Sequence, residues 1–275
     1  MKFAICNEQY RGWDFERVCA DAASCGYDGV ELAPFTFDED PRRIDERRAA
    51  AVGAAANAAG LEIVGLHWLL LRPQGLHLTT PDDLVRAQTV AFLQHLARLC
   101  AAAGGQVMVF GSPNQRDRAA GQSADDTFRR AVDACRQVAE VAGPLGVTLA
   151  MEPLGPKETN FMVYARDTVK LLDAVDHPAC RLQLDVKAMS AEAEPVDQVI
   201  RSYASRMAHF HANDANLRGP GFGDTDFVPI AAALKDVGYD GWVSVEVFDA
   251  QIDPHETSTR SIEYLKRTFK EAGAI

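Results

Sequence analysis

Ionisable side chains stand at or near the ends of four successive apolar runs in the second half of the chain. The runs are VTLAME at 147–152, CRLQLD at 180–185, MAHFHA at 207–212 and WVSVEV at 242–247, and the side chains are Glu152, Asp185, His211 and Glu246. Three carboxylates and an imidazole gathered in one buried place repel one another and lose hydration unless a cation binds them. The set suits one divalent metal ion, such as Mn²⁺, Mg²⁺ or Co²⁺, and Zn²⁺ also fits.

The run MAHFHA contains two histidines that need to be told apart. His209 and His211 share one face, because residues two apart in a strand point the same way. His211 is nearer the strand end and is the expected metal ligand. His209 is expected one layer deeper, as a hydrogen-bonded core residue.

Two earlier runs also end in polar residues that are expected to face the same place. Glu31 lies near the end of GVEL at 29–32, and His67 lies near the end of LEIVGLHW at 61–68. His67 could bind a substrate hydroxyl or carry a proton near neutral pH, or it could make a structural hydrogen bond. Trp68 could form an apolar wall against a sugar face or pack in the core.

These residues require a scaffold that brings many strand ends together. Two further strand-like runs, FAIC at 3–6 and QVMVF at 106–110, raise the number of apolar runs to eight, and helical stretches such as 15–26, 46–60 and 84–105 lie between them. Continuous Val-, Ile- and Leu-rich runs are typical of parallel strands buried on both faces. The alternation predicts an α/β fold, a single (β/α)8 TIM barrel over residues 1–275, whose functional residues lie at the C-terminal ends of the strands.

A short repeated motif supports this alternation. Gly-Tyr-Asp-Gly occurs at 26–29 and again at 238–241, each time between a helical stretch and a strand-like run. Glycine at the end of a helical stretch is typical of the left-handed residue that closes a helix. An open doubly wound sheet is the alternative, but no GxGxxG or Walker-type loop follows any of the runs.

Composition excludes several classes of function. The formal net charge is −11 and the only basic run, RRIDERR at 42–48, is interrupted by acids, which disfavours nucleic acid as a partner. No stretch approaches the roughly 20 apolar residues of a membrane span, and the N-terminus does not resemble a signal peptide. The six cysteines are scattered without a CxxC pair, which predicts reduced thiols and a cytoplasmic protein.

The motifs together resemble the xylose isomerase-like barrel superfamily, in particular its sugar isomerase and epimerase group, which includes ketose 3-epimerases, inosose-processing enzymes and hydroxypyruvate isomerases. The motifs are MEPL at 151–154 with Glu158 just after, LD at 184–185, HFHAND at 209–214, RGPGFGDTDF at 218–227 and VEVF at 245–248. The resemblance covers essentially the whole chain. It implies one divalent ion, Mn²⁺ above all, held by Glu152, Asp185, His211 and Glu246.

The resemblance also implies a reaction. Glu152 and Glu246 would be the catalytic pair, one removing a proton beside a carbonyl group and the other returning it to the opposite face, through a metal-stabilised enediolate. Glu158 matches a position that contacts substrate or orients the base, and Arg218 matches a position that reaches substrate oxygens. The glycines at 219–223 would let this loop close over the site. A carbohydrate substrate and, as in many relatives, a homo-oligomer are the expected partners.

One position departs from the epimerase pattern. Ketose epimerases of this group carry a histidine three residues after the aspartate that corresponds to Asp185, where this chain has Ala188, preceded by Lys187. Lys187 could supply a different substrate contact or point into solvent. The missing imidazole argues against simple 3-epimerisation of a free ketose and leaves a glycoside, a 3-keto sugar or a carboxylated sugar open.

Two other enzyme activities and one non-catalytic function compete with the epimerase interpretation. A lyase or deglycosidase acting on a 3-keto-glycoside would share the metal and the first proton abstraction. An apurinic endonuclease would need more metal ligands and a basic face, and seven histidines with a charge of −11 argue against it. A non-catalytic sugar-binding barrel would not need the four ligand residues.

Overall fold

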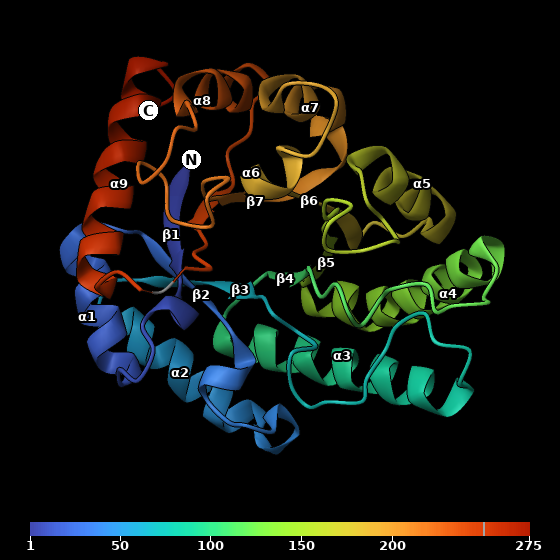
Figure 1. The fold of residues 1–275 in the computed structure, drawn as a ribbon. Coiled ribbons are helices and arrows are strands. Elements are labelled where there is room, and N and C mark those ends of the chain that lie inside the picture. The colour runs from blue at the N-terminus through green and yellow to red at the C-terminus, as the bar shows by residue number, and fades with distance from the viewer. Residues whose placement is uncertain (250) are drawn as a thin grey trace.

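The computed structural model, which describes residues 1–249 and 251–275, is a closed barrel of parallel strands. The strands pair in chain order from β1 to β8, and β8 pairs with β1 to close the ring (Figure 1). Their bounds are β1 Lys2–Cys6, β2 Gly29–Leu32, β3 Glu62–Leu66, β4 Val107–Phe110, β5 Thr148–Met151, β6 Cys180–Asp185, β7 Met207–Ala212 and β8 Trp242–Val245. The predicted (β/α)8 barrel is confirmed.

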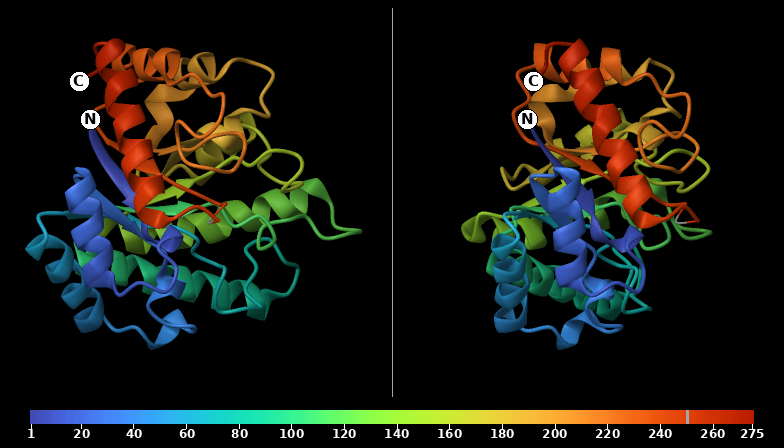
Figure 2. Two further views of the ribbon diagram at one scale, coloured as in Figure 1. Left: turned by 60° about the vertical axis from the view of Figure 1, so that its left-hand side comes forward. Right: turned by 90° about the vertical axis from the view of Figure 1, so that its left-hand side faces the viewer.

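Helices that follow the strands form the outer layer. They are α1 Phe15–Cys25, α2 Glu46–Ala58, α3 Asp83–Ala103, α4 Ala124–Ala142, α5 Ala165–Val175, α6 Val186–Met189, α7 Val196–Tyr203, α8 Phe227–Asp236 and α9 Pro254–Glu271. Short 3₁₀ turns are inserted, of which η1 at Asn7–Gln9 directly follows β1. The last helix, α9, packs beside the first, α1, so the two ends of the chain meet where the barrel closes (Figures 1 and 2).

Each predicted strand run contains an observed strand, and the differences lie at the ends. β3 stops at Leu66 and β8 at Val245, both two residues before the end of the predicted run. As a result His67, Trp68 and Glu246 begin loops at the C-terminal ends of their strands. Residues there are freed from the sheet and can turn their side chains toward the barrel axis.

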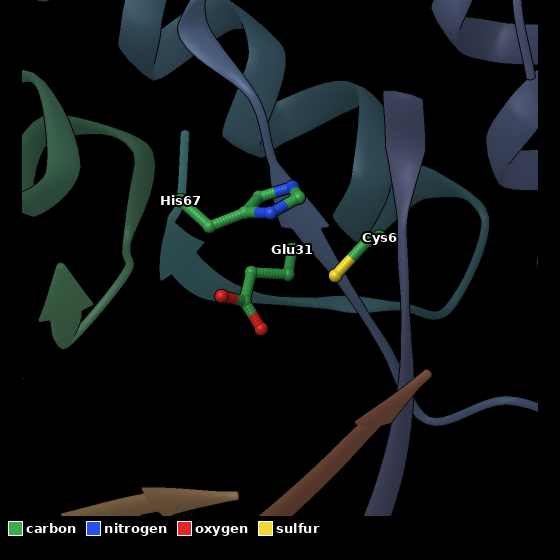
Figure 3. A group of neighbouring side chains, drawn as sticks. All are labelled: Cys6, Glu31 and His67. Carbon is green, nitrogen blue, oxygen red and sulfur yellow. The ribbon is translucent and has the colours of Figure 1, made fainter. Parts of the chain in front are cut away.

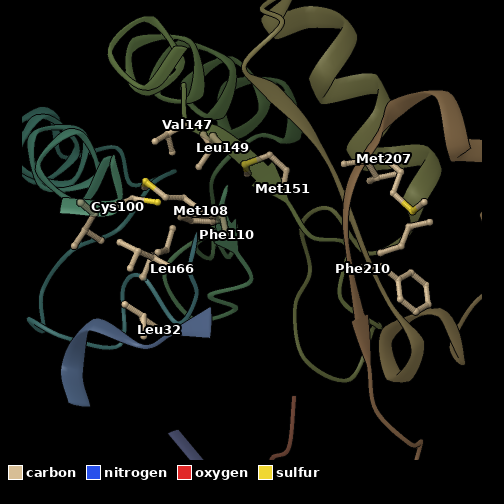
Figure 4. Close-up of a cluster of buried hydrophobic side chains, with 14 of the residues drawn as sticks. Leu32, Leu66, Cys100, Met108, Phe110, Val147, Leu149, Met151, Met207 and Phe210 are labelled. Atoms are coloured by element: carbon tan, nitrogen blue, oxygen red, sulfur yellow. The ribbon is translucent and has the colours of Figure 1, made fainter. Parts of the chain in front are cut away.

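The hydrophobic core lies mainly between the strands and the helices. Side chains such as Leu66, Met108, Leu149 and Met151 point outward from the barrel into this layer (Figure 4). Their strand neighbours point inward, where the second cluster consists of small residues, namely Ala4, Val64, Val107, Val109 and Ala150. Alternation along each strand therefore fixes which residues face the barrel axis.

The same alternation creates polar layers inside the barrel. Asp185 pairs in register with His211, and Gln183 pairs with His209 one layer below. His211 in turn is in register with Ser244, two residues before Glu246. The predicted ligands thus occupy the layer nearest the C-terminal mouth.

Both Gly-Tyr-Asp-Gly motifs close a helix before a strand, as expected. Gly26 and Gly238 have φ of 93° and 68°, a region that glycine enters without steric cost. The amide of the following tyrosine then bonds back to the helix, Tyr27 to Ala22 and Tyr239 to Leu234.

The basic run at 42–48 is not the single helix face that its charge pattern indicated. It spans the end of the 3₁₀ turn Pro41–Arg43 and the start of α2, with buried Ile44 between them. In the part of the chain that the structure describes, no helix is both long and apolar enough to cross a membrane.

Candidate metal centre

The four predicted ligands converge at the mouth of the barrel. Glu152, Asp185, His211 and Glu246 each offer one ligand atom, and these atoms all lie within 4.8 Å of one another on buried side chains. Ligand atoms on opposite sides of an ion that they bind at about 2.0–2.6 Å lie roughly 4–5 Å apart. Three carboxylates and one imidazole within this spacing fit a single divalent cation.

The charge of the cluster also fits a cation. Burial, together with the neighbouring carboxylates of Asp185 and Glu246, raises the pKa of Glu152 to about 8. Burial likewise raises the pKa of Asp185. Both shifts reflect the cost of placing negative charges together without water, a cost that a bound divalent ion removes.

Neighbouring groups hold the Asp185 carboxylate in a fixed orientation. The Ala188 backbone amide donates to Oδ1 at 2.8 Å, and the Asn213 side-chain amide donates to Oδ2 at 2.5 Å. Asn213 in turn accepts from the Lys187 backbone amide at 2.8 Å. Groups of this kind behind a ligand fix its direction.

Glu246 lies between two imidazoles. Its Oε2 is 3.1 Å from Nδ1 of His211, and its Oε1 is 3.3 Å from Nδ1 of His67. Burial by itself would raise the pKa of Glu246, but His211 and His67 outweigh it, and the pKa is lowered. Glu246 is therefore the carboxylate of the cluster that most readily stays ionised.

Glu31 lies deeper than the sequence suggested. It was expected to face the mouth with the substrate residues, but it is fully buried and contacts two histidines instead. Its Oε1 is 3.1 Å from Nε2 of His211, and its Oε2 is 2.8 Å from Nε2 of His209. A carboxylate on one ring nitrogen orients the other toward a metal, so Glu31 is placed to aim Nδ1 of His211. His209 lies in the core as a hydrogen-bonded residue, as expected.

A further polar group joins the first three strands. Cys6, Glu31 and His67 point toward one another from β1, β2 and the end of β3 (Figure 3), with ligand atoms within 4.8 Å. Burial raises the pKa of the Cys6 thiol well above its usual value, and the nearby carboxylate of Glu31 adds to the shift. Cys6 is therefore a protonated core thiol beneath the mouth.

Glu8 belongs to the site and was missed from the sequence. It lies in the turn η1 just after β1, and its Oε2 is 2.9 Å from Nε2 of His67. Although burial opposes protonation of His67, Glu8 and Glu246 on its two sides raise its pKa to about 10. The strand-end rule that singled out Glu152 and Glu246 would have found Glu8 had it been applied to β1.

Gly111, directly after β4, was also missed. A Cβ atom at this position would lie 1.8 Å from Oε2 of Glu152. The Glu152 carboxylate therefore occupies the space that the side chain of any other residue at position 111 would fill. A glycine at a strand end beside a ligand strand is the only sequence signal for this role, and it is weak.

A cavity adjoins the ligands and gathers four of the predicted substrate residues. Its lining includes Glu152, Glu246, His67, Trp68, Glu158, Lys187 and Phe248. Nζ of Lys187 lies 2.9 Å from Oε2 of Glu158 and 4.3 Å from the centre of the Phe248 ring. Burial by itself would lower the pKa of Lys187, but Asp185 and Glu158 outweigh burial and raise the pKa. The cavity therefore contains a cation.

Arg218 is not part of this lining. Its Nε donates to Oδ2 of Asp249 at 3.0 Å, and its side chain is 41% exposed. The glycine-rich loop that follows lies against α9, where Arg260 donates to the Gly221 carbonyl at 2.8 Å. In this structure α9 therefore holds the loop that was expected to close over the site.

Comparison with known proteins identifies relatives. A family model described as xylose isomerase-like TIM barrel matches residues 19–268. A D-psicose 3-epimerase from Ruminiclostridium cellulolyticum is 29% identical over 241 residues, which cover 86% of this chain and 78% of that protein. Among solved structures, an L-ribulose 3-epimerase superposes with a TM-score of 0.86 at 22% identity, over 99% of this chain and 95% of the other. A 3-keto-D-glucoside 4-epimerase from E. coli superposes with a TM-score of 0.85 at 18% identity, over 97% and 99% of the two chains.

Proposed function

The chain belongs to the xylose isomerase-like TIM barrel family, and from this premise we propose that it is a divalent-metal-dependent enzyme that epimerises a keto sugar at a carbon beside the carbonyl group. One observation carries the proposal: Glu152, Asp185, His211 and Glu246 converge within metal-binding distance beside a cavity. The similarity to a D-psicose 3-epimerase supports a keto sugar as the substrate class.

Glu152, Asp185, His211 and Glu246 would hold the ion. The oxygen-rich set favours Mn²⁺ or Mg²⁺, and we propose Mn²⁺. When bound, the ion polarises the substrate carbonyl and stabilises negative charge on neighbouring oxygens. Glu31 and Asn213 would keep His211 and Asp185 oriented for it.

Glu152 and Glu246 would move the proton. One carboxylate removes it from the carbon beside the carbonyl, and the other returns it to the opposite face of that carbon. Glu246 is held between His67 and His211, which fixes its direction. The other ring nitrogen of His67 is anchored by Glu8, so His67 would bind a substrate oxygen only after leaving one of these two carboxylates.

The remaining lining would bind the sugar. Glu158 and Lys187 offer an acceptor and a donor on one wall of the cavity, and Trp68 and Phe248 offer aromatic faces on another. Arg218 would contact substrate oxygens only after leaving Asp249. The six free thiols support a reducing compartment such as the cytoplasm.

A 3-keto-glycoside is the second substrate candidate, either as an epimerase substrate or as a lyase substrate. Ala188 stands where ketose epimerases of the group carry a histidine, which leaves the cavity wall next to Lys187 without an imidazole. The structural similarity to a 3-keto-D-glucoside 4-epimerase is consistent with this candidate.

Deuterium incorporation from D₂O tests the proposal. A panel of ketoses and 3-keto-glycosides is incubated with the protein and Mn²⁺, and again after treatment with a chelator. We expect metal-dependent exchange of one carbon-bound hydrogen and a product of unchanged mass apart from the deuterium. A fragment in place of a stereoisomer would assign the lyase reaction.

Two variants serve as controls. Glu246→Gln removes a proposed ligand and base, and should lower the exchange rate by at least about 10²–10⁴-fold, the usual contribution of a general base. Glu256→Gln changes an exposed acid on α9 and should leave the rate unchanged. Near-normal exchange in Glu246→Gln would rule out the proposed mechanism.

A further inference from the structure

A second group of metal-competent side chains lies outside the barrel, between α1 and α9. Asp21 and Cys25 are one helical turn apart at the end of α1, and His255 is the second residue of α9. The three ligand atoms lie within 4.8 Å of one another. We propose that Asp21, Cys25 and His255 form a separate site for a thiolate-binding divalent cation of the Zn²⁺ class, independent of the function proposed for the barrel mouth.

The spacing of the three ligand atoms is close to that of a tetrahedral zinc site. With Zn–S near 2.3 Å and Zn–N or Zn–O near 2.0–2.1 Å, the sulfur lies about 3.5 Å from each other ligand. Sγ of Cys25 is 3.8 Å from Nδ1 of His255 and 3.9 Å from Oδ2 of Asp21. Only the Asp21–His255 contact, a hydrogen bond of 2.6 Å, has to widen, because the ion replaces the proton between them.

Asp21 and Cys25 lie close to the same ring nitrogen of His255, and this arrangement favours a metal site over a catalytic triad. A triad passes a proton through the imidazole and therefore uses both of its nitrogens. Here Asp21 and Cys25 both approach Nδ1 of His255. The ligand atoms of Asp21, Cys25 and His255 instead surround a common point, where an ion can bind.

Exposure lets an ion reach this cluster. The His255 side chain is 58% exposed, while that of Asp21 is only 11% exposed and so is held in place. Cys25 is half-buried, whereas the other five cysteines are buried. An open side at His255 also leaves a fourth tetrahedral position for water, near Oγ1 of Thr259, which lies 3.4 Å from Sγ of Cys25.

The ligand types select a different ion from that of the barrel mouth. Thiolate and imidazole ligands favour Zn²⁺, whereas carboxylate-rich sites suit Mn²⁺ and Mg²⁺. On binding, the Cys25 thiol loses its proton to solvent and its sulfur bonds the ion. The proton on Nδ1 of His255 moves to Nε2, and the Asp21 carboxylate exchanges its hydrogen bond for the ion, so one proton is released per ion bound.

Binding at this site would tie the first helix to the last. Hydrogen bonds already join the two ends of the chain here, with the hydroxyls of Tyr10 and Tyr27 bonded to Ser258 of α9. An ion shared by α1 and α9 adds a link beside the β1–β8 seam. It should therefore stabilise the folded chain even when the barrel mouth is disabled.

Cobalt provides the decisive probe, because a thiolate bound to Co²⁺ gives a sulfur-to-metal charge-transfer absorption that carboxylates and imidazoles do not give. The metal-free full chain is titrated with Co²⁺. We expect this band in the unchanged protein and in Glu246→Gln, which lacks a ligand of the barrel mouth. Cys25→Ser should abolish the band, and His255→Ala should weaken Co²⁺ binding at this site by at least about tenfold.

Glu256→Gln is the matched control, since it removes an exposed acid beside His255 and should keep the band. A second readout is the Zn²⁺-dependent rise in the melting temperature of Glu246→Gln, which should disappear when His255→Ala is added; His255 is exposed, so its loss leaves the fold intact. Absence of the band in the unchanged protein, or an equal band in Cys25→Ser, would overturn the proposal.

Discussion

Charge balance dominates the site at the scale of single residues. The proposed ligands include two carboxyl groups whose pKa values burial raises, Glu152 and Asp185, beside one that two imidazoles keep ionised, Glu246. Such opposite shifts on neighbouring acids are typical of functional sites. They also make the affinity for a metal depend on pH.

The proton on Glu152 should compete with the metal. With a pKa of about 8, this carboxyl group is mostly protonated at neutral pH in the metal-free protein, and the ion must displace the proton. Affinity for Mn²⁺ should therefore weaken as pH falls below about 8, by up to about tenfold per pH unit. Calorimetric titration between pH 6 and 9 measures this, and Glu152→Gln should bind more weakly and show a smaller dependence, since His211 must still lose its proton to bind the ion. An affinity independent of pH in the unchanged protein would contradict the raised pKa.

Gly111→Ala should damage the site without unfolding the chain. The added Cβ would lie 1.8 Å from Oε2 of Glu152 and must displace the carboxylate. A displacement of about 1 Å in a catalytic group costs roughly 100-fold in rate. Steady-state turnover and the melting temperature are compared with those of Gly143→Ala, where the nearest atom is His177 Cε1 at 3.2 Å. Equal activity in the two variants would show that the position of Glu152 is not critical.

Helix and strand ends carry the next level of organisation. Strand β8 ends one residue before Glu246, and β5 ends one residue before Glu152, so both proposed bases stand at the first position outside the sheet. Helix starts are fixed by acceptor side chains, for example Asp82 ahead of α3, whose Oδ1 accepts from the amides of Leu84 and Val85 at 2.9 and 3.1 Å. These caps satisfy amides that have no partner within the helix.

Asp82→Ala should therefore destabilise the barrel modestly. Loss of a capping acceptor costs about 1 kcal/mol in the free energy of unfolding. Asp82→Asn keeps the acceptor and should remain close to the unchanged protein. Urea unfolding followed by circular dichroism distinguishes the two, and an identical loss in both variants would assign the effect to charge instead of capping.

The closed ring governs behaviour at the scale of the whole molecule. Four consecutive strands, β5 to β8, supply Glu152, Asp185, His211 and Glu246. Glu8 follows β1 and His67 follows β3, so the site forms only when the ring is closed. An ion bound there favours the folded state, because the unfolded chain does not hold its ligands together.

Removal of Mn²⁺ should therefore lower the free energy of unfolding, and the size of this loss should depend on the proposed metal ligands. Binding at 100 times the dissociation constant adds about 2.7 kcal/mol to the free energy of unfolding. Urea unfolding with Mn²⁺ and after chelation should show this difference in the unchanged protein and a much smaller one in Glu246→Gln. An undiminished effect in the variant would place the stabilising ion elsewhere.

The amino-acid sequence by itself determined the barrel and the four converging residues. Buried parallel strands appear as continuous apolar runs, and the polar residue that interrupts each run at its end identifies the mouth. Side-chain alternation placed His209 and His211 on one face, and nearness to the strand end then separated the ligand His211 from the deeper His209.

Only the tertiary structure decided which groups surround those four. Glu31 lies beneath His211 and not at the mouth, Glu8 pairs with His67 across two strands, and Arg218 pairs with Asp249 outside the cavity. Gly111 matters only because Glu152 turns toward it, and His255 approaches Cys25 from 230 residues away. These contacts depend on how strand tilt, loop path and side-chain rotamer combine in space, and no local pattern of residues encodes that combination.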